Sequence, residues 1–153
     1  MKHLIETGCA FCAIAQGEAD ADVVYEAEHV VAFLDRKPLF PGHVLIIPRD
    51  HFATLADLPD GRIGPIFTAA KLLARTVQRA LKAQGTFVAI NNVVSQSVPH
   101  LHVHVVPRNR GDGLRGFFWP RNAYDSDAHR REVAEQIRRT LNAPNAPLGE
   151  RPT

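Results

Sequence analysis

Residues 98–106 read VPHLHVHVV, in which imidazoles alternate with aliphatic side chains at His100, His102 and His104. Aliphatic and β-branched residues with a period of two predict a strand, and side chains on a strand point to opposite faces in turn. All three imidazoles therefore share one face of the predicted strand, and the intervening leucine and valines enter a core. The chain has eight histidines, so the gathering of three here indicates a site rather than a chance run.

The rest of the sequence surrounds this segment with further strands and two helices. The predicted strands are Val23–Tyr25, Val30–Leu34, HVLIIP (43–48), TFVAINN (86–92) and HLHVHVV (100–106). One predicted helix begins at LPDG (58–61) and is stopped by Gly85, and a second runs from Asp125 or Ser126 to about Leu141. Strands, helix, strands and helix in this order predict an α+β fold with an antiparallel sheet.

Length and composition restrict the class of protein. A chain of 153 residues with 45% hydrophobic and 22% charged residues is typical of one soluble domain. We expect residues 1–142 to form that domain and the proline-rich residues 143–153 to be a disordered tail. The net charge of +2 does not indicate a nucleic-acid partner. No apolar stretch is long enough for a membrane span or a signal peptide, so we expect no membrane partner and a cytoplasmic location.

The first chemical motif is a cysteine pair near the N-terminus. Cys9 and Cys12 have the C-x-x-C spacing of two thiolates on one zinc ion. His51 and His100 are candidates for the two remaining ligands. The alternative is a redox pair as in thioredoxin-like proteins. That alternative needs a strand before the motif and a helix beginning within it, and the sequence clearly indicates neither.

The second motif is the histidine run with SQS (95–97) before it. A neutral imidazole attacks phosphorus well, provided that an acceptor holds its other ring N–H and so fixes the tautomer. Gln96 and Ser97 offer donors for the charge that develops on phosphoryl oxygens. The motif therefore indicates covalent catalysis by a histidine of this run, with His102 and His104 as the candidates. A metallohydrolase in which the three histidines bind a catalytic metal is the competing hypothesis.

The pattern His-φ-His-φ-His-φ-φ resembles the signature of the histidine triad (HIT) superfamily. CAFCAIAQGE, VVYEAEHVVAFLDRKPLFPGHVLIIPRDH and SQSVPHLHVHVVPR also resemble HIT segments, in the expected order. The resemblance implies a five-stranded α+β meander with a long helix between strands and a C-terminal helix, and it implies a homodimer. It also implies attack on the α-phosphate of a nucleotide through a nucleotidyl-histidine, with release of a nucleoside monophosphate. Relatives of this kind include histidine-triad nucleotide-binding proteins and fragile-histidine-triad hydrolases.

The resemblance further implies roles for individual residues. Its catalytic residues correspond to His102 as nucleophile, His104 on the phosphate, His43 as support from the neighbouring strand, and Ser97 near the leaving group. Its nucleotide contacts correspond to Asp35 on the ribose hydroxyls, Asn91, Gln96, Ser97 and His104. The zinc ligands of its zinc-containing bacterial members correspond to Cys9, Cys12, His51 and His100. Four protein ligands would make this zinc structural, and no organic cofactor is implied.

The sequence after the triad bears on the substrate. Arg108, Arg110 and Arg115 favour an extended phosphate chain, and hence a dinucleoside polyphosphate hydrolase. A nucleoside phosphoramidate hydrolase and a zinc-stabilised nucleotide-binding regulatory protein are the alternatives. The segment 111–121 also holds an aromatic trio that could stack on a base or pack the dimer, Phe117, Phe118 and Trp119.

Overall fold

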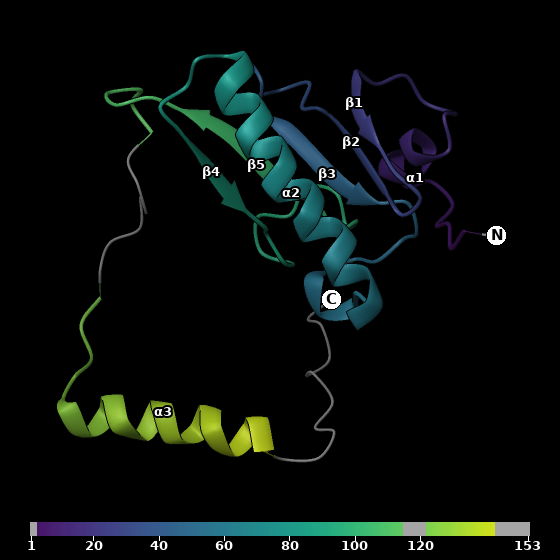
Figure 1. The fold of residues 1–153 in the computed structure, drawn as a ribbon. Helices are drawn as coiled ribbons and strands as arrows, with labels where there is room; N and C mark the ends of the chain where they lie inside the picture. Colours follow the sequence, from purple (N-terminus) through teal and green to yellow (C-terminus); the bar gives the residue numbers. More distant parts are fainter. Residues whose placement is uncertain (1–2, 115–121, 143–153) are drawn as a thin grey trace. The chain divides into compact units, whose positions relative to one another are not determined.

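The computed structural model describes residues 3–114 and 122–142. The chain divides into two units, Met1–Gly113 and Leu114–Thr153. The first unit holds a five-stranded sheet with helices α1 and α2, and the second holds helix α3 (Figure 1). None of the helices in the described ranges is long and apolar enough to cross a membrane.

The sheet confirms the predicted α+β class and the antiparallel arrangement of its strands. Its strands are β1 (Val23–Glu26), β2 (Val30–Leu34), β3 (Val44–Pro48), β4 (Gly85–Ala89) and β5 (Val103–Arg108). Every neighbouring pair is antiparallel, and the spatial order is β1-β2-β3-β5-β4. The predicted meander is therefore interrupted once, because consecutive strands are neighbours except for β3 and β4. Helix α2 carries the chain to the far edge, where β4 forms, and β5 then returns between β3 and β4.

Helices cover the two faces of the sheet differently. Helix α2 (Asp60–Ala80) lies along one face (Figure 1), because its apolar residues recur on one side at helical spacing. The core on that face includes Ile46, Ile66, Leu73, Leu101, Val103 and Val105. The short helix α1 (Ala10–Ala15) was not predicted, and it contributes to a second core on the opposite face. That second core contains Phe11, Ala15, Val31, Phe33, Leu45 and Ile47.

The histidine segment alternates between faces as predicted, but only part of it is strand. β5 begins at Val103, which is paired with Ile46, so two of the three histidines precede the strand. The reason is local, since the Leu101 N–H donates to the Phe52 carbonyl at 2.6 Å, away from the neighbouring strand. His104 lies opposite Leu45 of β3 and therefore shares the face that α1 covers.

The structure differs from the prediction at the end of α2, at the start of β4 and in a short turn before α2. Helix α2 ends at Ala80, and Lys82 rather than Gly85 adopts the left-handed conformation there, with a φ of 55°. Gly85 instead begins β4. A 3₁₀ turn, Leu55–Asp57, precedes α2. Glycine favours a left-handed C-terminal position, but any residue that ends the helix can occupy it at some cost.

The unit 114–153 contains the predicted C-terminal helix. α3 spans Asp127–Asn142. The Ser126 hydroxyl oxygen accepts a hydrogen bond from the His129 N–H at 3.0 Å, so Ser126 rather than Asp125 caps the helix. The aromatic trio, Arg115 and the predicted tail fall outside the described residues.

The loop before the triad is strained at two residues. Val93 and Ser95 have φ values of 67° and 60°, and a left-handed conformation is unfavourable for a β-branched residue. We therefore expect Val93→Gly to raise the free energy of unfolding by about 1 kcal/mol. Urea denaturation measures this change. Val94→Gly is the control, because Val94 has no positive φ and is 78% exposed, and it should be neutral or destabilising. An equal effect of both substitutions would contradict the strain.

Candidate active site and metal centre

Two of the triad histidines open into a cavity on the α1 face of the sheet. The cavity has a volume of about 480 Å³, within the range of small-molecule sites. His102 and His104 lie at its wall with Ser97 and Asp35, and its apolar part includes Phe11, Ile14, Phe33 and Leu45. The combination of an apolar wall with a few convergent polar groups is typical of a ligand site.

A directed chain of hydrogen bonds assigns the tautomers of His43 and His104. The Leu39 N–H donates to His43 Nδ1 at 3.2 Å, so the proton of His43 is on Nε2. His43 Nε2 then donates to His104 Nδ1 at 2.9 Å, which leaves the proton of His104 on Nε2. Among the described residues His104 Nε2 has no hydrogen-bond partner although it is buried. A buried donor without a partner is costly, and here it borders the cavity.

His102 has the opposite tautomer. Its Nδ1–H donates to the His100 carbonyl at 2.7 Å, so Nε2 carries the lone pair. The ring is 3% exposed and lies edge-on to Phe11, with centroids 5.2 Å apart and planes at 89°. The centroid of His104 is 4.8 Å away. The site thus sets one imidazole lone pair next to one imidazole N–H donor, as attack on phosphorus requires.

Burial keeps the supporting histidines neutral. Burial, with smaller contributions from nearby His102 and His43, lowers the pKa of His104 to about 4 against the opposing effect of Asp35. Burial also lowers the pKa of His43, again against the effect of Asp35. Both rings therefore stay in the neutral form on which the hydrogen-bond chain depends.

This pKa predicts that the fold loses stability in acid. The pKa of His104 lies below its ordinary value, so the unfolded chain binds a proton that the folded chain does not as the pH falls from about 6.5 toward 4. We expect the free energy of unfolding to fall by about 1 kcal/mol more in the wild type than in His104→Gln between pH 7 and pH 5. Urea titrations at both pH values measure the difference. Both proteins share the metal centre, so its own acid sensitivity cancels, and parallel losses would contradict the shift.

The structure brings some of the predicted nucleotide contacts to the cavity and not others. Asp35 and Ser97 line it, and Asp35 Oδ1 accepts a bond from the Lys37 N–H at 2.8 Å. The Gln96 amide is instead engaged with the backbone, donating to the Ala53 carbonyl and accepting from the Val93 N–H. Neither Gln96 nor Asn91 is among the residues that line this cavity. β4 ends at Ala89, so Asn91 follows the strand rather than lying on it.

The arginine expected to reach a longer substrate is paired within the chain. Arg108 donates two hydrogen bonds to the Asp112 carboxylate, from Nε at 2.6 Å and from a terminal nitrogen at 3.0 Å. Such a bidentate pair holds the guanidinium firmly. Neither Arg108 nor Arg110 lines the cavity.

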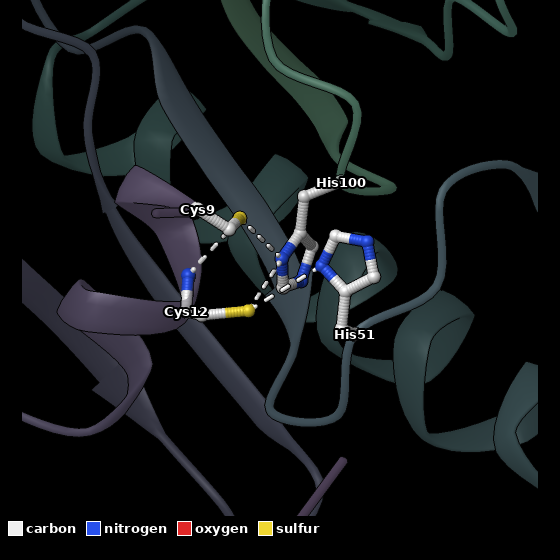
Figure 2. A group of neighbouring side chains, drawn as sticks. All are labelled: Cys9, Cys12, His51 and His100. Atoms are coloured by element: carbon white, nitrogen blue, oxygen red, sulfur yellow. Dashed lines mark hydrogen bonds between the residues drawn. The ribbon is translucent and has the colours of Figure 1, made fainter. Parts of the chain in front are cut away.

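The second cluster unites the predicted metal ligands. One ligand atom from each of Cys9, Cys12, His51 and His100 lies within 4.8 Å of the other three (Figure 2). His100 Nδ1 is 3.5 and 3.6 Å from the two sulfurs, and His51 Nδ1 is 3.4 Å from Cys12 Sγ. Tetrahedral zinc bonds of about 2.3 Å to sulfur and 2.0 Å to nitrogen give S···N separations of about 3.5 Å. The donor set therefore fits a tetrahedral Zn²⁺.

The hydrogen-bond partners of His51 and His100 on the side away from the sulfurs support this fit. His100 Nε2–H donates to the Pro48 carbonyl at 3.0 Å, and His51 Nε2 is 2.5 Å from the Glu6 carboxylate. Both rings therefore present an unprotonated Nδ1 to the sulfurs, as metal binding requires. Burial raises the pKa of the Cys12 thiol, which disfavours a thiolate unless a cation is bound there.

Glu6 is a residue that no sequence pattern pointed to. It lies on the unpatterned N-terminal segment, and only the fold brings its carboxylate to His51. We expect Glu6→Gln to weaken Zn²⁺ binding by about tenfold, since outer-shell partners fix the ligand tautomer and raise its basicity. Competition with a chromophoric chelator measures the affinity. Glu18→Gln, an exposed acid on the chain after α1, is the matched control, and equal affinities for the two variants would contradict the role of Glu6.

Helix α1 corrects one step of the sequence argument. A helix does begin within the C-x-x-C motif, with Cys9 as N-cap and its Sγ accepting from the Cys12 N–H at 3.4 Å. The redox alternative thus meets one of its two structural requirements. The described residues before Cys9 form no strand, and two histidines complete the donor set. The geometry accordingly favours a metal centre.

Sequence comparisons identify relatives over most of the chain. A model described as the HIT domain matches residues 16–111. An uncharacterised HIT-like protein of Methanocaldococcus jannaschii is 39% identical over 69% of this chain and 82% of its own. An adenosine 5'-monophosphoramidase of Candida albicans is 34% identical over 78% of this chain and 82% of its own. An asymmetrical bis(5'-nucleosyl)-tetraphosphatase of Schizosaccharomyces pombe is 33% identical over 60% and 52%.

Structural comparisons agree with these matches. A HIT family protein of Bacillus subtilis superimposes with a TM-score of 0.82 at 31% identity, covering 90% of this chain and 99% of its own. A zinc-bound histidine triad protein of Mycobacterium smegmatis superimposes with a TM-score of 0.67 at 34% identity, covering 87% and 97%. Because the HIT domain model matches more than half of the chain and the relatives share over 30% identity across most of it, this protein belongs to the HIT family.

Proposed function

We propose that this protein transfers a nucleotidyl group from its substrate to His102 and then to water, releasing a nucleoside monophosphate. The observation that carries the proposal is the tautomer of His102, whose Nδ1–H is held by the His100 carbonyl so that Nε2 has a lone pair. The tetraphosphatase and monophosphoramidase relatives act on nucleotide substrates, which supports this assignment.

Four polar residues of the cavity have a role in the proposed reaction. The ribose lies against Asp35, whose carboxylate accepts bonds from its hydroxyls. His102 Nε2 forms a bond to the α-phosphorus while the bond from phosphorus to the leaving group breaks. His104 Nε2–H and the Ser97 hydroxyl donate to the phosphoryl oxygens and to the leaving atom, which departs with a proton from one of these donors. Water then attacks the phosphorus and returns a proton to that donor, the N–P bond breaks, and His102 returns to its starting tautomer.

Two leaving groups are candidates. The sequence favours a polyphosphate chain because of the arginines after the triad, but Arg108 is held by Asp112. The phosphoramidase relative matches 78% of this chain, compared with 60% for the tetraphosphatase. A nucleoside phosphoramidate therefore stands beside a dinucleoside polyphosphate, and the two differ only in the group that leaves.

Trapping the covalent intermediate tests the proposal. Purified protein is mixed separately with diadenosine tetraphosphate and with adenosine phosphoramidate, quenched in mild alkali within the first turnover, and weighed intact. A transient adduct with the mass of an adenylyl group, absent from His102→Ala, is the expected result. The substrate that builds the adduct faster identifies the leaving group. Steady release of adenosine monophosphate by His102→Ala would overturn covalent catalysis, and binding without turnover of any substrate would favour a regulatory nucleotide-binding protein.

We further propose that the metal at the second cluster is zinc with a structural role. The zinc-bound mycobacterial relative and the donor set of Cys9, Cys12, His51 and His100 support this. Four protein ligands leave no open position for substrate or water, so the reaction runs on the side chains of the cavity alone.

We also propose a homodimer. Among the described strands β4 lies at an edge of the sheet, and a sheet edge readily adds a second strand. Val88 on this strand and Phe67 on α2 are both 43% exposed and supply apolar surface. Light scattering on the purified protein gives the mass that decides between one chain and two.

A further inference from the structure

We propose that the metal centre controls the affinity of the cavity for nucleotides, acting through helix α1 and the ring of Phe11. This inference rests on the proposed function, because it takes a nucleotide as the ligand of the cavity. The structure joins the two sites along two routes, one through a side chain and one through the backbone.

Helix α1 presents one side to each site. Cys9 and Cys12, three residues apart, lie at the metal cluster. Ala10, Phe11 and Ile14 line the cavity. Residues three or four apart share a helix face, so the two faces are separated by the helix itself. The position of the cavity wall therefore depends on where the two sulfurs are held.

Helix α1 is too short to hold itself in place. It spans Ala10–Ala15, whereas isolated helices shorter than about 12 residues are marginal in water. At its C-terminal end Arg49 donates to the Ala15 carbonyl at 2.9 Å. At its N-terminal end, Cys9 contacts His100. Cys12 contacts both His51 and His100. Bonds from both sulfurs to one metal would fix that end.

Phe11 transmits the position of the helix to the reacting imidazole. Its ring packs edge-on against His102 at 5.2 Å, against Phe33 at 5.4 Å and against His100 at 6.0 Å between centroids. The ring is 9% exposed and lies between the two thiols in sequence. Phe11 is thus a positioning residue, because it acts through the ring of His102 and through the cavity wall.

The second route is the backbone of a metal ligand. His100 contributes Nδ1 to the metal cluster, and its carbonyl accepts the Nδ1–H of His102 at 2.7 Å. A shift of His100 toward or away from the sulfurs would therefore move the acceptor that orients His102. Both routes predict that the metal-free protein binds nucleotide weakly even while the sheet and α2 remain folded.

Calorimetry with adenosine monophosphate tests the inference on four proteins. These are the metal-loaded wild type, the chelator-treated wild type, metal-loaded Phe11→Leu and metal-loaded Phe87→Leu. Phe87 lies on β4 and is not among the residues that line the cavity, so Phe87→Leu is the matched control. Metal content and far-ultraviolet circular dichroism accompany each titration, so that loss of metal or of fold is seen directly.

The expected result is a Kd about fivefold to tenfold higher for the metal-free wild type and for Phe11→Leu. Phe11→Leu should keep one metal per chain, and its KM should rise more than its kcat falls. Phe87→Leu should bind as the wild type does. If the metal-free protein unfolds, the metal-loaded Phe11→Leu decides the matter alone.

Two other outcomes are distinct. Unchanged affinity in Phe11→Leu, or in a folded metal-free wild type, would overturn the inference and leave the proposed function intact. No binding of nucleotide by the metal-loaded wild type would overturn the proposed function, and the inference with it.

Discussion

His102→Ala should abolish turnover while leaving the metal content of the protein unchanged. The substitution removes the Nε2 lone pair that the His100 carbonyl keeps available, and no other described imidazole lines the cavity with a free lone pair, because His104 uses its Nδ1 to accept from His43. We expect kcat to fall by about 10⁴-fold or more, as for other enzymes that lose a covalent nucleophile. Steady-state kinetics on the substrate that forms the adduct measures the loss.

The metal measurement separates the two enzymatic hypotheses. If the three histidines bound a catalytic metal, His102→Ala would lose that metal together with activity. Under covalent catalysis the metal content stays unchanged, since His102 is not among the four clustered donors. His29→Ala serves as the control for removing a histidine, because His29 lies in the turn between β1 and β2, and both its activity and its metal content should match the wild type.

Removal of the metal should have the largest effect on stability. Cys12 is 1% exposed, and a buried thiolate is costly unless a bound cation neutralises it. We expect chelation, or Cys12→Ser, to lower the free energy of unfolding by about 3 kcal/mol and the Tm by about 10 °C. Differential scanning calorimetry measures both values. At saturating substrate and well below the Tm, kcat should change by less than about threefold, because a four-ligand site takes no part in the chemical step.

A thermodynamic cycle provides the control. In chelator-treated protein, Cys12→Ser should lower the free energy of unfolding little further, since the metal that the thiolate would bind has already been removed. A metal-free wild type with the same Tm as the loaded protein would contradict a structural role. A fall in kcat of much more than threefold, measured at saturating substrate in metal-free protein that is still folded, would indicate a catalytic metal instead.

Local periodicity was sufficient to predict most of the sheet. The run HVLIIP, nearly all apolar, predicts a central strand, and β3 is the third of five. The exchange of β4 and β5 was not predictable from residue patterns, because neither strand encodes which neighbour it pairs with. Helix α1 was missed because six residues carry too little periodicity, although an aromatic side chain between two cysteines is, in retrospect, a signal that this segment faces two sites.

The candidate site was predictable to the extent that its residues lie in short motifs. Which of the other residues belong to the two sites depends on hydrogen bonds and ion pairs formed in the folded chain. Gln96 precedes the triad as a phosphate contact would, yet its amide is bound to Ala53 and Val93. Glu6 reaches His51 because the N-terminal segment is held at the end of β3, where the Leu4 carbonyl accepts from the His51 N–H and the Leu4 N–H donates to Asp50. Such contacts depend on three-dimensional proximity that the sequence does not display.

The insertion of β5 between β3 and β4 has a consequence for how the protein is made. During synthesis β3 and β4 emerge first, and their facing edges have no partner until residues 103–108 follow. His100 and His102 immediately precede these residues, so a nascent chain that stops before residue 100 has neither the complete metal centre nor the complete cavity. Pairing across such sequence distances is slow, and open strand edges associate with other chains while they wait. Residues 100–108 therefore complete the sheet, the metal centre and the cavity together, and a chain truncated before residue 100 would be both inert and prone to aggregate.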